Sequence, residues 1–202
     1  PPERRSRRNK SRKSSPKKPQ NKGIINTGTG TTINNGNIKL TGDSSIGIYG
    51  ENGTIINNSS VEAGNGAYTG SVLNSAVAMY GKNVTSVSNK GTINLTGAGS
   101  RTVGMVEEGA AAATATAKNS STITTDNAIG IAVLSGTGTS TGINTGTINV
   151  TTGTGVYAAG TNAGFNGAGG TINLTGTGTG IALNGTGAGK ITNARMKETE
   201  NV

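Results

Sequence analysis

The sequence predicts an all-β fold: a three-strand β-solenoid of about six coils that follows a disordered, basic N-terminal tail. Three observations support this prediction. Short segments alternate apolar and polar residues, the segments recur every 23 to 32 residues, and Gly and Asn cluster between them. We therefore divide the chain into a tail at 1–22, a solenoid at 23–192 and a polar C-terminal tail at 193–202.

The basic character of the chain belongs to residues 1–22. Ten Lys and Arg residues stand there against Glu3 alone, which accounts for the whole formal charge of +9. A charged segment rich in proline is expected to be disordered and solvated, with electrostatic binding to phosphate or acidic lipid as the alternative. The repeat region has no net charge, and we expect no nucleic acid to bind it.

The composition excludes a conventional globular core. The chain has 35 Gly, no Trp, one Phe and 2% aromatic residues, so little apolar area is available for burial. A solenoid avoids this difficulty because each coil needs only a few inward side chains, which stack on those of the neighbouring coils.

The first strand of five repeats follows the motif Asn-x-(Gly/Ser)-x-(Ile/Val), and a sixth copy at 169–176 keeps the strand around Ile172 but lacks the Asn. Its apolar position recurs along the chain, and a second apolar position follows two residues later, as expected for a strand. The column comprises Ile38, Val61, Ile93, Ile123, Ile148 and Ile172.

A second strand follows each copy of the motif and contains a small residue before an apolar one. The small-residue column comprises Gly47, Ala78, Gly104, Gly130, Gly155 and Gly180. The apolar column comprises Ile48, Met79, Met105, Ile131, Val156 and Ile181. A third strand precedes the Asn, around Ile55, Val87 and Ile143. We expect the apolar columns to stack as the structural core ladder.

The turns between strands predict the corners of the coil. Gly and Asn tolerate left-handed backbone conformations, and aligned Asn side chains can form hydrogen bonds along the stack. The longest insertion, at 64–73, is the candidate partner-facing loop, and its candidate contact residues are Gly64, Asn65, Tyr68 and Thr69. The segment at 109–117 has the composition of either a strand or a short capping helix.

Catalytic chemistry has little support in the sequence. His and Cys are absent, which removes the commonest general base and the commonest nucleophile pairs. We predict no catalytic residue, no cofactor and no metal site, and no enzyme activity. The candidate carboxylates, which we expect to be solvated at corners, are Asp43, Glu51, Glu62, Glu107, Glu108 and Asp126.

The units NKGTINLTGAGSRTVGM, NTGTINVTTGTGVYAAG and GGTINLTGTGTGIAL resemble passenger repeats of the autotransporter adhesins that Gram-negative bacteria export by type V secretion. The likeness covers about 21–192. It implies a right-handed parallel β-helix that is secreted or exposed at the cell surface or outer membrane and acts in adhesion and virulence. It also implies a host or bacterial receptor or glycan as partner and, in the full-length form, an outer-membrane barrel.

Three functions therefore compete. The first is a non-catalytic, surface-exposed autotransporter passenger fragment that acts as an adhesin or structural stalk. The second is an ice-binding β-solenoid, which requires a regular outward Thr-x-Thr column. The third is a polysaccharide-acting β-helix or phage spike protein, for which Glu107 and Glu108 are the residues to test.

Overall fold

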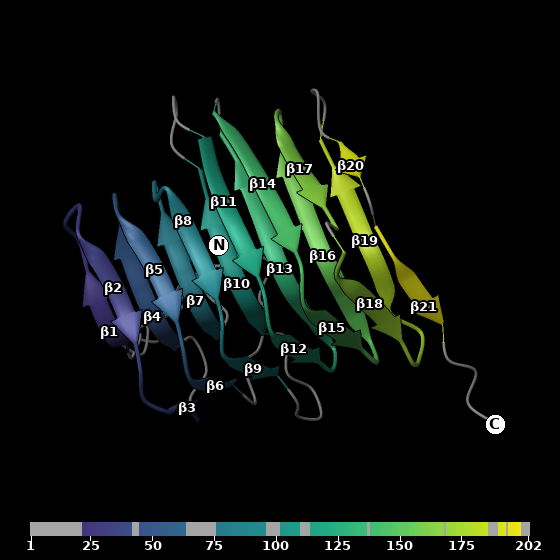
Figure 1. Ribbon diagram of the computed structural model, residues 1–202, viewed down its shortest axis with the longest axis horizontal. Helices are drawn as coiled ribbons and strands as arrows, with labels where there is room; N and C mark the ends of the chain where they lie inside the picture. The colour runs from purple at the N-terminus through teal and green to yellow at the C-terminus, as the bar shows by residue number, and fades with distance from the viewer. Residues whose placement is uncertain are drawn as a thin grey trace, which may run out of the picture.

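The computed structural model describes residues 22–41, 45–63, 76–95, 102–109, 114–136, 138–167, 169–185, 190–192 and 194–198. These residues form strands and turns, and the strands build three parallel sheets that wind into a β-solenoid (Figure 1). The predicted all-β solenoid is confirmed. The predicted tail at 1–22 lies outside the described residues except for Lys22, which begins the first strand.

Each sheet receives one strand from every coil. Sheet A contains β1 (Lys22–Asn26), β4 (Ile46–Glu51), β7 (Val77–Lys82), β10 (Val103–Glu108), β13 (Ala128–Ser135), β16 (Gly153–Gly160) and β19 (Thr179–Asn184). Sheet B contains β2 (Thr31–Asn34), β5 (Thr54–Asn57), β8 (Ser86–Asn89), β11 (Thr114–Asn119), β14 (Thr139–Asn144), β17 (Ala163–Asn166) and β20 (Ile191–Thr192). Sheet C contains β3 (Ile38–Leu40), β6 (Ser60–Ala63), β9 (Thr92–Leu95), β12 (Thr122–Thr125), β15 (Thr147–Val150), β18 (Thr171–Leu174) and β21 (Met196–Glu198).

The described residues thus form seven coils, compared with the six repeats found in the sequence. Coil 1 begins with β1, and coil 7 ends with β21, which pairs with β18 in parallel. The sequence places 196–198 in a polar tail because MKE shows no repeat motif. Backbone pairing to the preceding coil extends the sheet despite that composition. The segment at 109–117 contributes a strand from Thr114, and 110–113 lie outside the described residues.

The strands of sheet C show why short apolar alternation is sufficient for this fold. In β9, Ile93 and Leu95 are buried while Thr92 and Asn94 are exposed. The inward side chains of neighbouring coils lie in register, and each buried isoleucine contributes about 1.5–3 kcal/mol through removal from water. The registered column is Ile38, Val61, Ile93, Ile123, Ile148 and Ile172.

The apolar column of sheet A is also in register. It runs through Ile48, Met79, Met105, Ile131, Val156 and Ile181. The small-residue column stands beside it for a steric reason. A Cβ at Gly104 would lie 2.5 Å from the carbonyl oxygen of Gly130, and one at Gly130 would lie 2.6 Å from that of Gly155. Most copies therefore have Gly at this position.

The third inward column, in sheet B, differs from the sequence expectation at one coil. Ile55 and Val87 are buried in register, but Ile143 lies at an outward position of β14, and Gly142 takes the inward one. A Cβ at Gly142 would lie 3.1 Å from Cδ2 of Phe165, the registered residue in the next coil. The glycine makes room for the ring.

A buried ladder of asparagines follows the corner between sheets B and C. Each side-chain amide donates to the side-chain oxygen of the next coil at 2.8 to 2.9 Å, which confirms the expected Asn stack. The ladder comprises Asn34, Asn57, Asn89, Asn119 and Asn144. It ends at Asn144 in coil 5, because Gly170 of coil 6 stands next to Asn144, whose amide instead donates to backbone oxygens of Gly146 and Thr171.

Candidate functional site

The outer side of sheet A carries a group of aromatic and charged side chains. Tyr49 and Tyr80 occupy registered positions of β4 and β7, and their rings stack with centroids 5.5 Å apart and planes 9° apart. The ammonium of Lys22 lies 4.3 Å from the centroid of the Tyr49 ring, within cation–π range. Lys22, Tyr49 and Tyr80, from coils 1 to 3, therefore form one aromatic cluster.

Two carboxylates complete this aromatic cluster. The hydroxyl of Tyr49 donates to Glu51, and the hydroxyl of Tyr80 donates to Glu108. Burial, together with the Glu51 carboxylate, raises the pKa of Tyr49 to about 12. Burial and Glu108 raise the pKa of Tyr80 as well. Both phenols therefore stay protonated at neutral pH and act as donors, not as bases or nucleophiles.

Apolar side chains underlie the aromatic cluster. Ile46, Val77, Val103, Val106 and Ala132 are buried on the outer side of sheet A, in a second hydrophobic cluster separate from the solenoid interior. A break in the alternation at the small-residue column explains this second cluster. Because it shifts the alternation by one position, the residues before and after it reach opposite sides of the sheet. The sequence did not predict these outward residues. The strands of sheet A have apolar side chains on both sides of the sheet, whereas only an inward apolar column was expected.

Glu107 departs most from the sequence expectation. We expected a solvated carboxylate at a corner, but Glu107 is fully buried, at a position registered with Gly81 and Val133. Neither carboxylate oxygen has a hydrogen-bond partner among the described residues. Burial raises the pKa of Glu107 to about 7, the nearby hydroxyl of Ser140 lowers it in part, and the charge of Glu108 raises it further. The expectation was wrong because β10 continues as far as Glu108, so that Glu107, two residues after the inward Met105, also faces the interior.

The other candidate carboxylates are on the outer side or outside the described residues. Glu62 pairs with Lys39 at 3.6 Å, and both side chains are largely exposed. Asp126 accepts a hydrogen bond of 2.9 Å from the hydroxyl of Thr152. Asp43 lies outside the described residues.

The two carboxylates proposed for glycoside chemistry do not face a common space. Glu107 lies inside the solenoid and Glu108 lies outside it, hydrogen-bonded to Tyr80. A glycosidase requires both carboxyl groups to flank the same bond. The Glu107–Glu108 pair cannot supply that arrangement.

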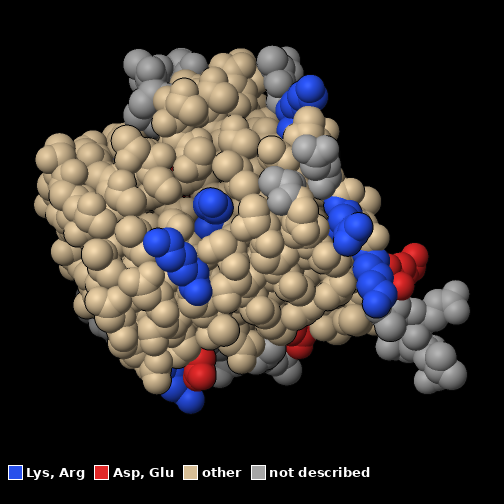
Figure 2. Space-filling model, viewed as in Figure 1, with Lys and Arg blue, Asp and Glu red and all other residues tan. Residues whose placement is uncertain are grey.

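The outer sides of sheets B and C are rich in hydroxyl and amide groups. A shallow cleft of about 370 Å³ on sheet B is bordered by Thr139, Thr141, Asn162 and Lys190. Figure 2 shows that the side of the molecule in view carries few charged side chains. Such a surface offers hydrogen bonds to a polar partner without strong charge selectivity.

A single column of outward threonines runs through Thr122, Thr147 and Thr171 on sheet C, but outward Thr-x-Thr pairs stand in register in only two of the described coils. Thr114 and Thr116 of β11 are in register with Thr139 and Thr141 of β14. In the next coil, Gly164 replaces the registered threonine. The array is therefore too short for the long Thr-x-Thr column that ice binding requires.

The candidate loop residues Gly64, Asn65, Tyr68 and Thr69 lie outside the described residues. In the described ranges, no three His, Cys, Asp or Glu side chains gather as potential metal ligands. Those same ranges contain no helix able to span a bilayer. No family model, curated protein or solved structure matches the chain.

Proposed function

We propose that the chain is a non-catalytic, surface-exposed passenger segment of the autotransporter adhesin type, which acts as a stalk and binds a cell-surface receptor or glycan. The observation that carries this proposal is the run of registered, hydroxyl- and amide-rich strands on the outer sides of sheets B and C. The separation of Glu107 from Glu108 supports a binding role over glycan cleavage.

The stalk role rests on the uninterrupted stacking of coils. Parallel strands lie about 4.8 Å apart, so seven coils extend about 30 Å along the axis. Each coil is stabilised mainly by its neighbours, which is the design of an extended scaffold. The cleft beside Thr141 and Lys190 is the proposed contact for a polar saccharide or receptor.

Binding of the full chain to mammalian cells, bacterial cells and a glycan panel tests the proposal. We expect saturable binding without release of free sugar. Thr141→Val and Lys190→Ala should weaken the binding, and Lys82→Ala, at an exposed position of sheet A outside the proposed contact, serves as the matched control. Absence of saturable binding to any of these surfaces, or turnover of a glycan, would overturn the proposal.

A further inference from the structure

A pocket of about 250 Å³ opens on the outer side of sheet A, where the chain passes from sheet C into β10, β13 and β16. Its lining includes Val103, Ile129 and Thr154, which form one outward column in register across coils 4 to 6. The second hydrophobic cluster contains Val103, and Ile129 packs against it, whereas Thr154 continues the column with a hydroxyl. The pocket therefore has an apolar wall and a polar wall.

The backbone at the corner gives the pocket a fixed shape. Asn127 and Gly153, which both line it, have left-handed conformations, with φ of 52° and 96°. The backbone N–H of Asn127 donates to the carbonyl of Thr152 in the next coil at 2.9 Å. No side chain can stand at Gly153, because a Cβ there would lie 2.2 Å from the carbonyl oxygen of Ala128. Stacking of the coils thus forms the pocket before any ligand arrives.

Three polar side chains line this pocket. The side chain of Asn127 is exposed, that of Thr154 is half-buried, and neither forms a hydrogen bond within the part of the chain that the structure describes. The hydroxyl of Thr102 is buried and has no partner among the same residues. Because buried polar groups are normally hydrogen-bonded, a ligand hydroxyl seated against Thr102 would supply the missing partner.

Tyr157 lies on the same outer side, three residues after Thr154 in β16 and about 10 Å further along the strand. The ring is half-buried, and the registered residues on either side of it are Ala132 and Ala182. Its hydroxyl accepts a hydrogen bond of 3.3 Å from the side-chain amide of Asn184. An aromatic ring with small neighbours, held at its polar end, offers a platform for the apolar face of a sugar ring.

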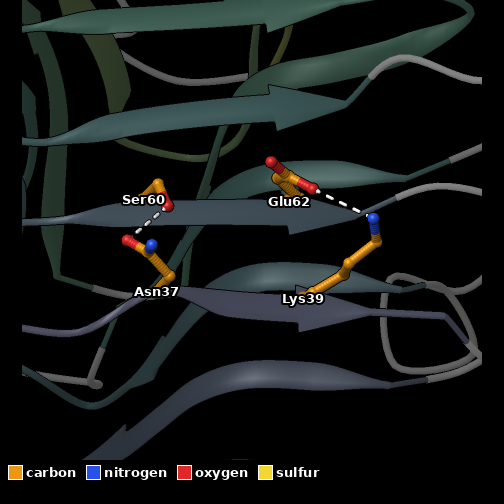
Figure 3. A network of polar contacts seen from close by, with 4 residues as sticks. All are labelled: Asn37, Lys39, Ser60 and Glu62. Atoms are coloured by element: carbon orange, nitrogen blue, oxygen red, sulfur yellow. Dashed lines mark hydrogen bonds and ion pairs between the residues drawn. The ribbon is translucent and has the colours of Figure 1, made fainter.

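The charge around this pocket favours a neutral ligand. The strands of sheet A in coils 5 to 7, which are β13, β16 and β19, contain no charged residue. Asp126 precedes Asn127 at the corner, where it accepts a hydrogen bond from Thr152 and would repel an anionic ligand. Sheet C differs, because the ion pair of Lys39 and Glu62 lies there beside the hydrogen bond from Ser60 to Asn37 (Figure 3).

We propose that the outer side of sheet A binds a neutral oligosaccharide, with one hexose ring in the pocket and the next ring against Tyr157. The volume lies below the range of about 300–1,000 Å³ that is typical for drug-sized ligands, so it suits a single ring. Ile129 meets the apolar face of that ring, while Asn127 and Thr154 bind its hydroxyls. This second site does not depend on the cleft proposed on sheet B.

Calorimetric titration of the full chain with lactose, maltose, cellobiose, glucose and glucuronate tests the proposal. We expect at least one of the three disaccharides to bind saturably and more tightly than glucose, and glucuronate to bind more weakly than glucose. Asn127→Gly keeps the left-handed backbone, removes the amide and should weaken disaccharide binding about tenfold. Asn83→Gly, at a corner with a φ of 54° outside the pocket, is the matched control and should leave the affinity unchanged.

Replacement of Tyr157 tests the second half of the site. Tyr157→Ala should weaken disaccharide binding about tenfold, whereas Tyr157→Phe keeps the ring and should retain the binding. Tyr49→Ala, in the same outward column of coil 2, is the matched control. The Phe variant and Asn127→Gly still test the site if the Ala variant does not fold.

Three results would overturn the proposal. The first is that none of the three disaccharides binds, and the second is that Asn127→Gly and Asn83→Gly bind them equally well. The third is that Lys190→Ala abolishes the binding while Tyr157→Ala retains it. That last result would place the saccharide on sheet B, in agreement with the proposed function and against a site on sheet A.

Discussion

Glu107 and Glu108 are neighbours in β10, yet their side chains lie on opposite sides of sheet A. Glu107 is buried in the solenoid interior without a hydrogen-bond partner among the described residues, while Glu108 accepts the phenolic hydrogen of Tyr80 on the outer side. The two environments give these adjacent carboxylates different roles. Glu108 accepts a hydrogen bond from the aromatic stack, and we expect buried Glu107 to make the stability of the coils sensitive to pH.

The first prediction concerns Glu107→Gln and the pH dependence of unfolding. The pKa of Glu107 rises from 4.5 to about 7 on folding. Glu107 therefore contributes about 3 kcal/mol to the free energy of unfolding. This contribution is complete below about pH 4.5 and is lost as the pH rises through 7. Denaturation of wild-type chain should therefore show declining stability between pH 5 and about 8, and the Gln variant should lack this decline.

Glu62→Gln is the control for the Glu107 experiment. Glu62 is exposed and its ion pair with Lys39 lies on the surface, so its replacement should leave the pH profile of the wild type intact. The charged group nearest to Glu107 in sequence is Glu108, and Gly81 and Val133 in the neighbouring coils carry no charge. Parallel profiles for wild type and Glu107→Gln would contradict the assignment.

The sequence was sufficient to predict the solenoid and its columns because each depends on local rules repeated in every coil. Ile93, Ile123 and Ile148 share one motif, and identical strands in register must stack identically. The Asn ladder follows from the same repetition. Coil 7 was missed at Met196–Glu198 because pairing with β18, and not side-chain pattern, determines that strand.

The candidate site was predicted less well, for a physical reason. In a strand that alternates strictly, Val103 and Met105, which flank Gly104, would point to the same side of the sheet. The break in alternation at the small-residue column leaves Val103 outward and Met105 inward, and Glu107 faces the interior because it follows Met105 by two residues. A bulky residue at Gly104 is excluded by a carbonyl of the next coil, a contact that the sequence of one strand does not reveal.

The second prediction concerns the buried Asn ladder. Asn89→Ala removes both the acceptor of the Asn57 amide and the donor to Asn119, and leaves buried polar groups with fewer partners. We expect a loss of about 1–3 kcal/mol in the free energy of unfolding. Asn94→Ala, exposed on the neighbouring strand, is the control and should change stability by less than about 0.5 kcal/mol. Equal denaturation midpoints for the two variants would count against a stabilising ladder.

The third prediction compares one motif position in two coils. A Cβ at Gly146 would lie 2.0 Å from the carbonyl oxygen of Ser121, whereas a Cβ at Gly36 would meet no atom within 4 Å. Gly146→Ala should therefore cost about 1–3 kcal/mol through backbone displacement, and Gly36→Ala should be nearly neutral. Thermal unfolding of the pair measures the difference. Similar transitions would show that the coils can separate without cost at this corner.

The fourth prediction concerns the phenols of the aromatic cluster. Burial and the Glu51 carboxylate raise the pKa of Tyr49 to about 12, so its phenolate should form well above the ordinary pKa of 10. Glu51→Gln removes the negative charge that opposes ionisation and should lower the pKa of Tyr49. Phenolate absorbance, read directly after a rapid rise in pH and before unfolding, measures this change.

Tyr49→Phe identifies the part of the phenolate absorbance change that is due to Tyr49. Glu62→Gln, on sheet C, provides a control in which a carboxylate is removed elsewhere. The absorbance lost in the Phe variant should be the high-pH component. If the lost component instead titrates near pH 10, the hydroxyl of Tyr49 is not held by Glu51. The stacked pair with Tyr80 would then depend on ring contact alone, without the carboxylates that fix both rings.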